Sequence, residues 1–407
     1  MLTELHRVKK LRDTPCKLCV TPWFYFNSVI IMKNIVLINC LLFLLAGFLN
    51  SGCERNQRLF AGGFTKGDQK GLSVFDFNPG TGKLDLISEI DAGPSPSYFC
   101  FSKKNNMIYA INEVMEFKGQ FGGGLTTLKY DPETTKCEKL NEILIPYAGP
   151  CYISMSTDSG YLFIANYPNG SVAVVRLDEN GIPESITDTI LYVKEEPDRS
   201  HAHMILHDPG GKYVYVTDLG LDRIMVYDFD RSTGKLNERE NGITEVTAKS
   251  GPRHFAFNSD GSVLYLINEP GSTIMVFRIS DGEQLKLVQT VPTTREGFQG
   301  NNYCADIHIG KEGKFLYGSN RGENSIVVFK ISEDGLLSLA GHFDCGGDWP
   351  RNFVIDPSGK FLLVGNQKSD KITVFRLDNS NGLPSGIADS VKVNSVSCLK
   401  FEIPLDP

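Results

Sequence analysis

The pattern of apolar and polar residues repeats along most of the chain. In each repeat, a glycine- or asparagine-containing turn precedes six mostly apolar, often aromatic residues that end in asparagine or aspartate. These runs are residues 107–112, 161–166, 213–218, 263–268, 315–320 and 361–366. The preceding glycines from Gly160 to Gly359 are spaced by 51, 50, 52 and 46 residues. Self-similarity at such a period is typical of repeat architectures.

Each repeat contains further short strands. A polar turn and a second alternating run follow the last five runs, at 171–177, 223–229, 273–279, 325–331 and 371–377. A Gly-Leu or Gly-Lys-Leu turn then leads to another strand, and an opening strand such as 254–257 comes first. Four short alternating strands with regular turns predict a four-stranded antiparallel sheet. Such a sheet cannot bury both faces alone, so we expect the sheets to stack radially as propeller blades.

The number of blades follows from the strands left over at the two ends. Six copies are visible, while 59–77 supplies strands without an opening strand and 396–403 forms a lone strand. Joining these ends gives a seventh blade and removes exposed sheet edges. A solenoid would need capping repeats, and the sequence shows none. We therefore predict an all-β, seven-bladed β-propeller over residues 59–407, with both termini in one blade.

Composition narrows the function classes. The chain has 407 residues, a net charge of −7 and no run of Lys or Arg, which argues against nucleic-acid binding. The pair Cys16 and Cys19 has metal-site spacing but no second pair nearby, so we expect no metal site. Most other cysteines lie beside strand-like runs, where they are interpreted as small buried apolar residues. No cofactor is expected.

The N-terminal segment is interpreted as a targeting sequence. Met32-Lys33-Asn34 precedes an apolar run at 35–49 that is too short to span a bilayer, and Cys53 follows small residues. This resembles a bacterial lipoprotein signal, although Leu49 lies one place further from the cysteine than usual. We expect an upstream extension and signal at 1–52, lipidation at Cys53 and a linker at 53–58. This predicts the cell envelope, periplasm or outer membrane, with membrane contact only through the lipid. A plain signal peptide or uncleaved anchor is the alternative.

Polar residues interrupt the apolar pattern at repeated positions. Because the loops at one end of a propeller channel converge, these residues are expected to meet there. They occur in Ser200-His201-Ala202-His203, Gly251-Pro252-Arg253-His254, Asn268-Glu269, Asp306-Ile307-His308, Ser319-Asn320-Arg321, Pro350-Arg351-Asn352 and Gly365-Asn366-Gln367.

These motifs carry a resemblance to a known family. GPRH at 251–254, NE at 268–269, ADIH at 305–308, SNR at 319–321, NQKSD at 366–370 and the stretch 200–220 resemble the propeller lactonases. That family contains bacterial 6-phosphogluconolactonases and fungal carboxy-muconate cyclases. The resemblance implies an active site of one His, two Arg and one Glu at the channel mouth. These map to His203, Arg253, Glu269 and Arg321, with weaker substrate-binding candidates at His201, Asn268, Asn320, Arg351 and Gln367.

The four residues suit lactone hydrolysis, which needs an activated water, a stabilised oxyanion and a proton for the leaving alkoxide. Glu269 is expected to accept a proton from water, and His203 to supply one to the ring oxygen. Arg253 and Arg321 would hold an oxyanion, a carboxylate or a phosphate. The same set would serve a cyclase, with the arginines holding carboxylates while an acid protonates the diene.

Structural interpretations of these residues remain open. A histidine in a strand is often a hydrogen-bonded core group, which applies to His201, His207, His254 and His308. Each arginine could pair with an acidic residue of the next blade, and the sole role of Glu269 could be to neutralise Arg253. Glu113 follows Asn112 in the first repeat, so an Asn-Glu pair need not be catalytic. The asparagines that end the strands are typical turn formers.

Three functions therefore compete. The first is a hydrolase of a sugar-derived lactone, with a neutral aldonolactone favoured over a phosphorylated one because an export signal is present. The second is a carboxy-muconate cyclase, and the third is a non-catalytic binding propeller at the cell surface. The expected partner is a small-molecule lactone, and the protein is expected to be a monomer or simple homo-oligomer.

Overall fold

The computed structural model describes residues 56–193, 199–280 and 284–402. The predicted segment 1–52, the Cys16–Cys19 pair and Cys53 lie outside these residues, as does the first half of the predicted linker. Within the described ranges, no helix is long and apolar enough to cross a membrane.

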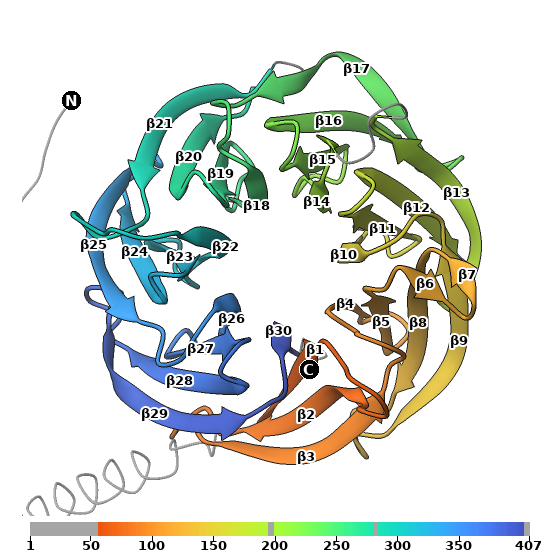
Figure 1. Cartoon of the computed structure of the whole chain (residues 1–407), viewed down its shortest axis with the longest axis horizontal. Coiled ribbons are helices and arrows are strands. Elements are labelled where there is room, and N and C mark those ends of the chain that lie inside the picture. Colours follow the sequence, from red (N-terminus) through yellow and green to blue (C-terminus); the bar gives the residue numbers. More distant parts are fainter. Residues whose placement is uncertain (1–55, 194–198, 281–283, 403–407) are drawn as a thin grey trace, which may run out of the picture. The chain divides into compact units, whose positions relative to one another are not determined.

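Seven four-stranded antiparallel sheets are arranged in a ring, as Figure 1 shows. The innermost strands are β4 (Tyr98–Ser102), β10 (Pro150–Met155), β14 (Ala202–His207), β18 (Pro252–Phe257), β22 (Tyr303–Ile309), β26 (Pro350–Ile355) and β30 (Val396–Phe401). The second strands are β5 (Met107–Asn112), β11 (Tyr161–Asn166), β15 (Tyr213–Asp218), β19 (Val263–Asn268), β23 (Phe315–Arg321), β27 (Phe361–Asn366) and β1 (Gln57–Gly63). The predicted seven-bladed propeller is confirmed.

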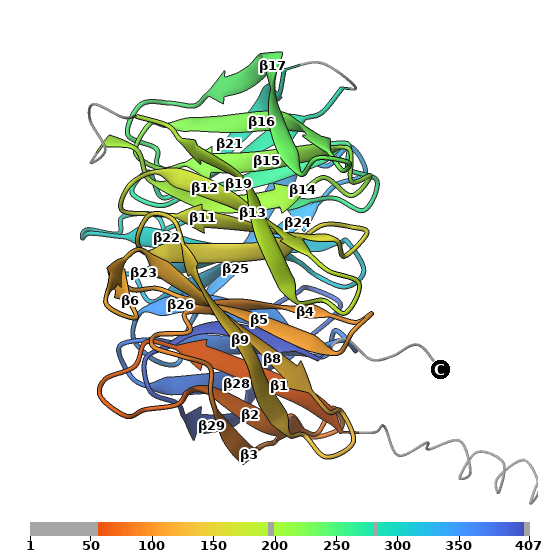
Figure 2. The same cartoon turned by 90° about the vertical axis from the view of Figure 1, so that its right-hand side faces the viewer.

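The third strands are β8 (Gly123–Tyr130), β12 (Ser171–Leu177), β16 (Arg223–Asp230), β20 (Thr273–Arg278), β24 (Ser325–Ile331), β28 (Lys371–Leu377) and β2 (Gly71–Phe77). The outer strands are β9 (Cys137–Ile145), β13 (Pro183–Leu191), β17 (Lys235–Glu245), β21 (Lys286–Pro292), β25 (Leu337–Asp344), β29 (Pro384–Lys392) and β3 (Leu84–Asp91). In the side view of Figure 2, outer strands such as β9 and β13 run obliquely to the inner ones, as the twist of each sheet requires. A short hairpin of β6 (Glu116–Phe117) and β7 (Gln120–Phe121) extends one blade.

The two ends of the chain close the ring. Strand β30 is innermost in the blade of β1, β2 and β3, and pairs antiparallel with β1. Phe77 lies between the aromatic rings of Phe361 and Phe401, at centroid distances of 5.5 and 5.1 Å. The predicted joining of both termini in one blade is therefore confirmed, and β1 begins at Gln57, two residues before the predicted start.

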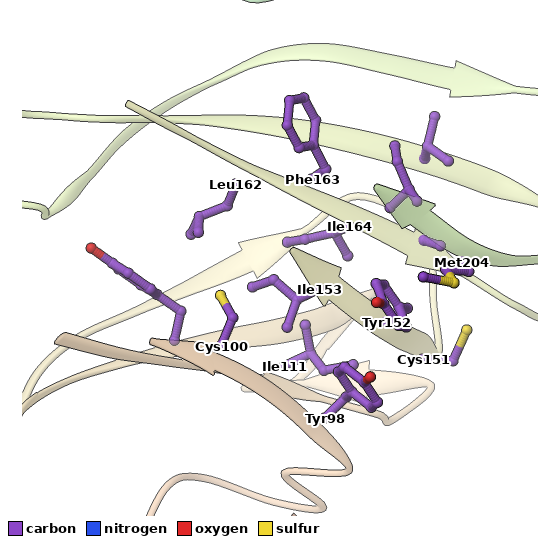
Figure 3. Close-up of a cluster of buried hydrophobic side chains, with 14 of the residues drawn as sticks. Tyr98, Cys100, Ile111, Cys151, Tyr152, Ile153, Leu162, Phe163, Ile164 and Met204 are labelled. Atoms are coloured by element: carbon purple, nitrogen blue, oxygen red, sulfur yellow. The ribbon is translucent and has the colours of Figure 1, made fainter. Parts of the chain in front are cut away.

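The core lies between neighbouring sheets. All side chains of β5, β11, β19 and β27 are buried, because the apolar residues on both faces meet an adjacent blade. Figure 3 shows one such contact, where Ile111, Ile153 and Ile164 pack together. Each fully buried side chain of this size contributes about 1.5–3 kcal/mol. Five of the six cysteines in the described residues are buried and none is paired, as expected.

Irregular pairing near the start of the innermost strands sets up the channel mouth. The register between first and second strands shifts in β10, β14, β18 and β26. The residue passed over in these shifts is Cys151, His203, Arg253 or Arg351. A β-bulge re-aims such a side chain out of the regular alternation. Three of these four equivalent positions thus hold a predicted site residue: His203, Arg253 or Arg351.

Candidate active site

A second repeated position supplies the facing side chains. It directly follows the terminal Asn or Asp of the second strand, and holds Glu113, Tyr167, Leu219, Glu269, Arg321 and Gln367. The backbone N–H of Glu269 donates to the carbonyl of Gly251 at 2.7 Å. The equivalent bond recurs in other blades, for example from Tyr167 to Gly149 at 3.0 Å. The same local structure therefore aims each of these residues at the same end of its blade.

Arg253, Glu269 and Arg321 form one cluster. Nε of Arg253 and Nη2 of Arg321 each lie 2.8 Å from Oε2 of Glu269. Arg253 Nη1 also donates to the carbonyl oxygen of Ala305. Arg321 donates from Nε to the Tyr303 carbonyl at 3.1 Å and from Nη2 to the Cys304 carbonyl at 3.0 Å. Three of the four predicted catalytic residues are thus in direct contact, across two neighbouring blades.

Burial and charge decide the protonation of this cluster. Burial lowers the pKa of Arg253 and brings that of Arg321 to about 9, so both remain cationic at neutral pH. Burial alone would raise the pKa of Glu269, but the charges of Arg321 and Arg253 outweigh it and lower the pKa. Glu269 is therefore a carboxylate held between two cations, which makes it a weak proton acceptor.

His203 lies beside the cluster and is only 4 % exposed. Its ring centroid is 5.1 Å from that of His254 and 5.6 Å from that of Tyr167. Burial, reinforced by the charge of Arg253, lowers its pKa well below 6.5. Nδ1 of His203 is buried without a hydrogen-bond partner among the described residues. His203 is therefore a neutral imidazole at pH 7, with one ring nitrogen that has no partner among the described residues.

His201 lies next to Tyr167 rather than in the arginine cluster. The two rings stack at 4.5 Å with an interplanar angle of 8°. His201 Nδ1 also lies 3.1 Å from the Tyr167 carbonyl oxygen. Because Tyr167 contacts both histidines, the stacked pair forms a wall beside His203. Tyr167 was not predicted from the sequence, although it occupies the position in its repeat that Glu269 occupies in another.

Arg351 and Gln367 lie in the blade of β26 to β29, which follows the blade of Arg321. Arg351 Nη2 is 4.0 Å from Oε2 of Glu113, and its guanidinium lies 5.3 Å from the ring centroid of Phe64. Burial raises the pKa of Glu113, an effect that the charge of Arg351 only partly opposes. Gln367 is half-buried, and its backbone N–H donates to the carbonyl of Trp349 at 3.0 Å. Arg351 thus adds a third guanidinium near this mouth.

Asn268 and Asn320 are fully buried inside their blades. Asn268 donates to the Thr273 hydroxyl at 3.0 Å. Asn320 donates to the Thr293 carbonyl and the Ser325 hydroxyl at 2.8 and 3.1 Å, and accepts from Asn302. The structure places both in turn-forming networks and does not bring them to the arginine cluster. These contacts favour the structural interpretation of the terminal asparagines.

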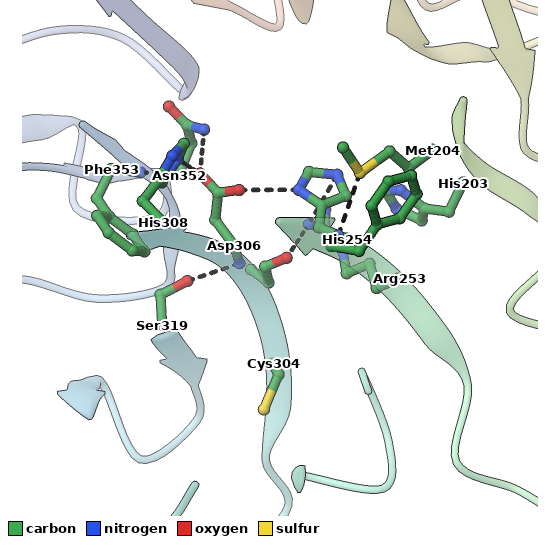
Figure 4. Close-up of polar contacts among 12 residues, drawn as sticks. His203, Met204, Arg253, His254, Cys304, Asp306, His308, Ser319, Asn352 and Phe353 are labelled. Atoms are coloured by element: carbon green, nitrogen blue, oxygen red, sulfur yellow. Dashed lines mark hydrogen bonds and ion pairs between the residues drawn. The ribbon is translucent and has the colours of Figure 1, made fainter. Parts of the chain in front are cut away.

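A buried network not assigned from the sequence lies beside Arg253, as Figure 4 shows. Oδ1 of Asp306 lies 2.8 Å from Nδ1 of His254, and Oδ2 lies 2.9 Å from Nε2 of His308. Asn352 Nδ2 and the backbone N–H of Phe353 also donate to Oδ2. The strand motifs contain His254 and Asp306, but only the ring geometry brings them together. Among the described residues, no group of three or more His, Cys, Asp or Glu could hold a metal ion.

The comparisons with known proteins decide the family. A model of the family described as "Lactonase, 7-bladed beta-propeller" matches residues 58–401. The chain belongs to this family. The family predicted from its motifs is therefore confirmed.

Several relatives are named as lactonases. The chain is 33 % identical to a 6-phosphogluconolactonase of Formosa agariphila, over 84 % of this chain and 99 % of the relative. It is 27 % identical to a 6-phosphogluconolactonase of Bacillus subtilis, over 84 % and 97 %. Among solved structures, the periplasmic gluconolactonase PpgL of Pseudomonas aeruginosa is 30 % identical, with a TM-score of 0.79 over 85 % of this chain and 99 % of that one.

Proposed function

We propose that this protein is a lactone hydrolase that opens a sugar-derived lactone with water at the mouth formed by His203, Arg253, Glu269 and Arg321. The observation that carries the proposal is the buried Arg–Glu–Arg cluster beside a neutral histidine. Lactonases named for 6-phosphogluconolactone and gluconolactone are among the relatives. An ester hydrolase needs both a proton acceptor and fixed positive charge; in this proposal His203 supplies the first and the two arginines supply the second.

In this mechanism, His203 is the base. Its neutral imidazole accepts a proton from water, and the resulting hydroxide attacks the lactone carbonyl carbon. When the C–O bond of the ring breaks, the same imidazolium returns the proton to the leaving alkoxide. Burial and the charge of Arg253 disfavour the imidazolium and lower the pKa of His203, so the returned proton leaves readily. This replaces the sequence-based expectation that Glu269 accepts the proton and His203 only donates one.

The arginines stabilise the oxyanion in this mechanism. A guanidinium has five N–H donors, and the contacts described above use only part of them on each side chain. The N–H groups that remain are proposed to bind the oxygen that gains charge as the tetrahedral intermediate forms. Glu269 compensates one of the two positive charges and fixes the distance between the guanidiniums. Its proposed role is therefore to orient the arginines rather than to take the proton.

The proposed substrate is a neutral aldonolactone, and the proposed location is the cell envelope, with Cys53 carrying a lipid. The apolar run before Cys53 supports export, and PpgL, described as periplasmic, is a related structure. Intact-mass analysis of the native protein is expected to give a chain that starts at a lipidated Cys53. A cytosolic chain that begins at Met1 or Met32 would contradict this location.

The decisive assay is proton release from a panel of lactones in a pH-stat, with spontaneous hydrolysis subtracted. Glucono-δ-lactone is expected to be hydrolysed with a higher kcat/KM than its 6-phosphate. The reverse order would contradict the proposed neutral substrate, and no release from any lactone would contradict the hydrolase. Loss of diene absorbance from a carboxy-muconate, without lactone hydrolysis, would instead assign a cyclase.

A further inference from the structure

The side chain of Arg253 is held from two directions. Its Nε faces Glu269, while its Nη1 donates to the Ala305 carbonyl and lies 3.3 Å from Nε2 of His254. For Nη1 to donate to His254, Nε2 must carry a lone pair rather than a proton. The position of the guanidinium therefore depends on which nitrogen of His254 is protonated.

Asp306 determines that choice. It is 2 % exposed, and donors surround its carboxylate: the ring of His254 at Oδ1, and the ring of His308, the amide of Asn352 and the Phe353 N–H at Oδ2. A carboxylate accepts hydrogen bonds only, so His254 must present Nδ1–H to it. Nε2 is then the unprotonated nitrogen, and it faces Arg253.

The charges on this network agree with that assignment. Burial, together with the nearby charge of Arg253, lowers the pKa of His254 to about 4. Burial would raise the pKa of Asp306, but its contacts with His308 and His254 outweigh this and keep it far below the usual range. The pair is therefore a neutral imidazole beside a carboxylate at neutral pH.

We propose that Asp306 and His254 are positioning residues of the hydrolase, which act by fixing the His254 tautomer and through it the guanidinium of Arg253. This inference rests on the proposed lactonase function of the site. Neither residue needs to touch the substrate. Their effect on the reaction passes through Arg253, whose proposed task is to bind the oxyanion.

Two residues of the network also border a cavity between the innermost strands. His308 and Asn352 line a cavity of about 460 Å³ whose other lining residues, such as Met155 and Leu206, also belong to the innermost strands. The Asp306 side chain is only 3 % exposed, whereas that of His308 is 39 % exposed. Water in this cavity can reach His308, but the carboxylate remains surrounded by donors.

Asp306→Asn tests the proposal because the surrounding hydrogen-bond donors determine which way the new amide is oriented. Its carbonyl oxygen is expected to face the three donors at the Oδ2 side, which turns the NH2 group toward His254. His254 Nδ1 must then accept a hydrogen bond from this NH2 group, so the ring proton moves to Nε2. There it faces the Nη1–H of Arg253, and two donors cannot form a hydrogen bond with each other. A misplacement of this kind typically costs about 10²-fold in rate. We expect this loss in kcat for glucono-δ-lactone, with KM changed less than about threefold.

Two measurements separate this role from a merely structural one. The first is the ¹⁵N NMR signal of the His254 ring, assigned by its absence in His254→Gln. It is expected to report neutral Nδ1–H in the wild type at pH 7 and Nε2–H in Asp306→Asn. The second is a double-mutant cycle with Arg253→Lys. In that background, Asp306→Asn is expected to lower kcat less than about threefold further, because the partner it acts through is already lost.

A matched control is Asp356→Asn, which removes another buried carboxylate, one that accepts from Ser358 and from the Phe361 N–H. It is expected to change stability but neither the His254 tautomer nor kcat. Equal losses from Asp306→Asn in both Arg253 backgrounds would overturn the proposal. If Asp306→Asn does not fold, a wild-type His254 that is protonated at Nε2 at pH 7 would overturn it. The NMR result is independent of turnover, so it remains valid if the lactonase assignment itself fails.

Discussion

Arg253 and Arg321 come from neighbouring blades and contact the same carboxylate oxygen, Oε2 of Glu269, each at 2.8 Å. Two like charges are stable this close together because one anion lies between them. The arrangement leaves a net positive charge in a buried site, which suits a reaction that develops negative charge. We therefore expect Glu269 to contribute to both stability and turnover.

We predict that Glu269→Gln lowers both stability and activity. The amide keeps the shape of the carboxylate but not its charge, so two buried guanidiniums lose their counter-ion. The expected cost is on the order of 3 kcal/mol in the free energy of unfolding, with a loss of about 10²-fold or more in kcat/KM. Denaturant melts and the pH-stat assay measure the two effects.

Glu142→Gln is the matched control for this change. Glu142 lies on the outer strand β9, with a similarly exposed side chain between Lys118 at 2.8 Å and Lys139 at 3.1 Å. Because it is far from the channel in its blade, its substitution is expected to leave kcat/KM unchanged. Wild-type turnover by Glu269→Gln would contradict the proposed role of the cluster.

Arg253→Lys is predicted to fail although the positive charge is kept. One ammonium group cannot reach Glu269, the Ala305 carbonyl and His254 together, as the planar guanidinium does. We expect kcat/KM to fall by about 10²–10³-fold, the usual cost of removing one oxyanion donor. Arg239→Lys on outer strand β17 is the control, since Arg239 pairs with Asp228 outside the channel. An Arg253→Lys enzyme that keeps most of the wild-type kcat/KM would argue against the oxyanion role.

The sequence was sufficient for the fold because the same signal recurs in every blade. The runs at 161–166, 213–218 and 361–366 coincide with observed strands residue for residue. The strand left over at each end then required a seventh blade. The hairpin β6–β7 was not predicted, because it is an insertion in one repeat with no counterpart in the others.

The site was only partly predictable, for a physical reason. Aligned repeats show that Arg253 and Glu269 occupy recurring positions, so their convergence could be expected. The bulges that re-aim His203 and Arg253 leave no trace in the alternation of apolar and polar residues. Contacts between blades depend on how the ring closes, which the sequence does not show directly. Asp306 was therefore interpreted only as part of a motif. The roles of His203 and Glu269 also depended on burial and neighbouring charge, which the sequence does not state.

The pH dependence of turnover tests the assignment of His203 as base. The base must be neutral, and burial lowers its pKa well below 6.5. Activity is therefore expected to be flat from pH 8 through 6.5 and to fall only at lower pH, as His203 becomes protonated. The measurement is kcat/KM against pH, and His203→Gln is expected to lose about 10²–10⁴-fold across the range. An acid limb centred at or above pH 6.5 would count against His203.

Stability is predicted to decline in the same acidic range through other histidines. Burial lowers the pKa of His254 and of His207 to about 4, so the folded protein resists protonation while the unfolded chain binds protons near pH 6.5. The contribution of these histidines to the free energy of unfolding is therefore fully present above pH 6.5. It is lost as pH falls toward 4, by about 3 kcal/mol for His254 alone. Denaturant melts from pH 7 to 4 check this. His207→Gln, remote from the Arg253 cluster, is expected to weaken the dependence without changing kcat.

We predict that the protein needs β30 to close the ring. A chain that ends at Ser395 lacks the innermost strand of one blade, including the buried side chains of Val396, Cys398 and Leu399. It also loses the bond from the Leu399 N–H to Asn352 Oδ1, which is 2.6 Å long, and leaves β1 with an unpaired edge. At about 1.5–3 kcal/mol for each large apolar side chain, the loss is comparable to the 5–15 kcal/mol that keeps a typical domain folded. We expect aggregation, a much lower melting temperature and no lactonase activity, whereas a chain that ends at Glu402 behaves as the full chain does. A peptide of residues 396–402 added in trans is expected to restore part of the activity, because it supplies the missing strand to an otherwise complete ring. A truncated chain that melts like the full-length protein would show that the seventh blade does not need its innermost strand.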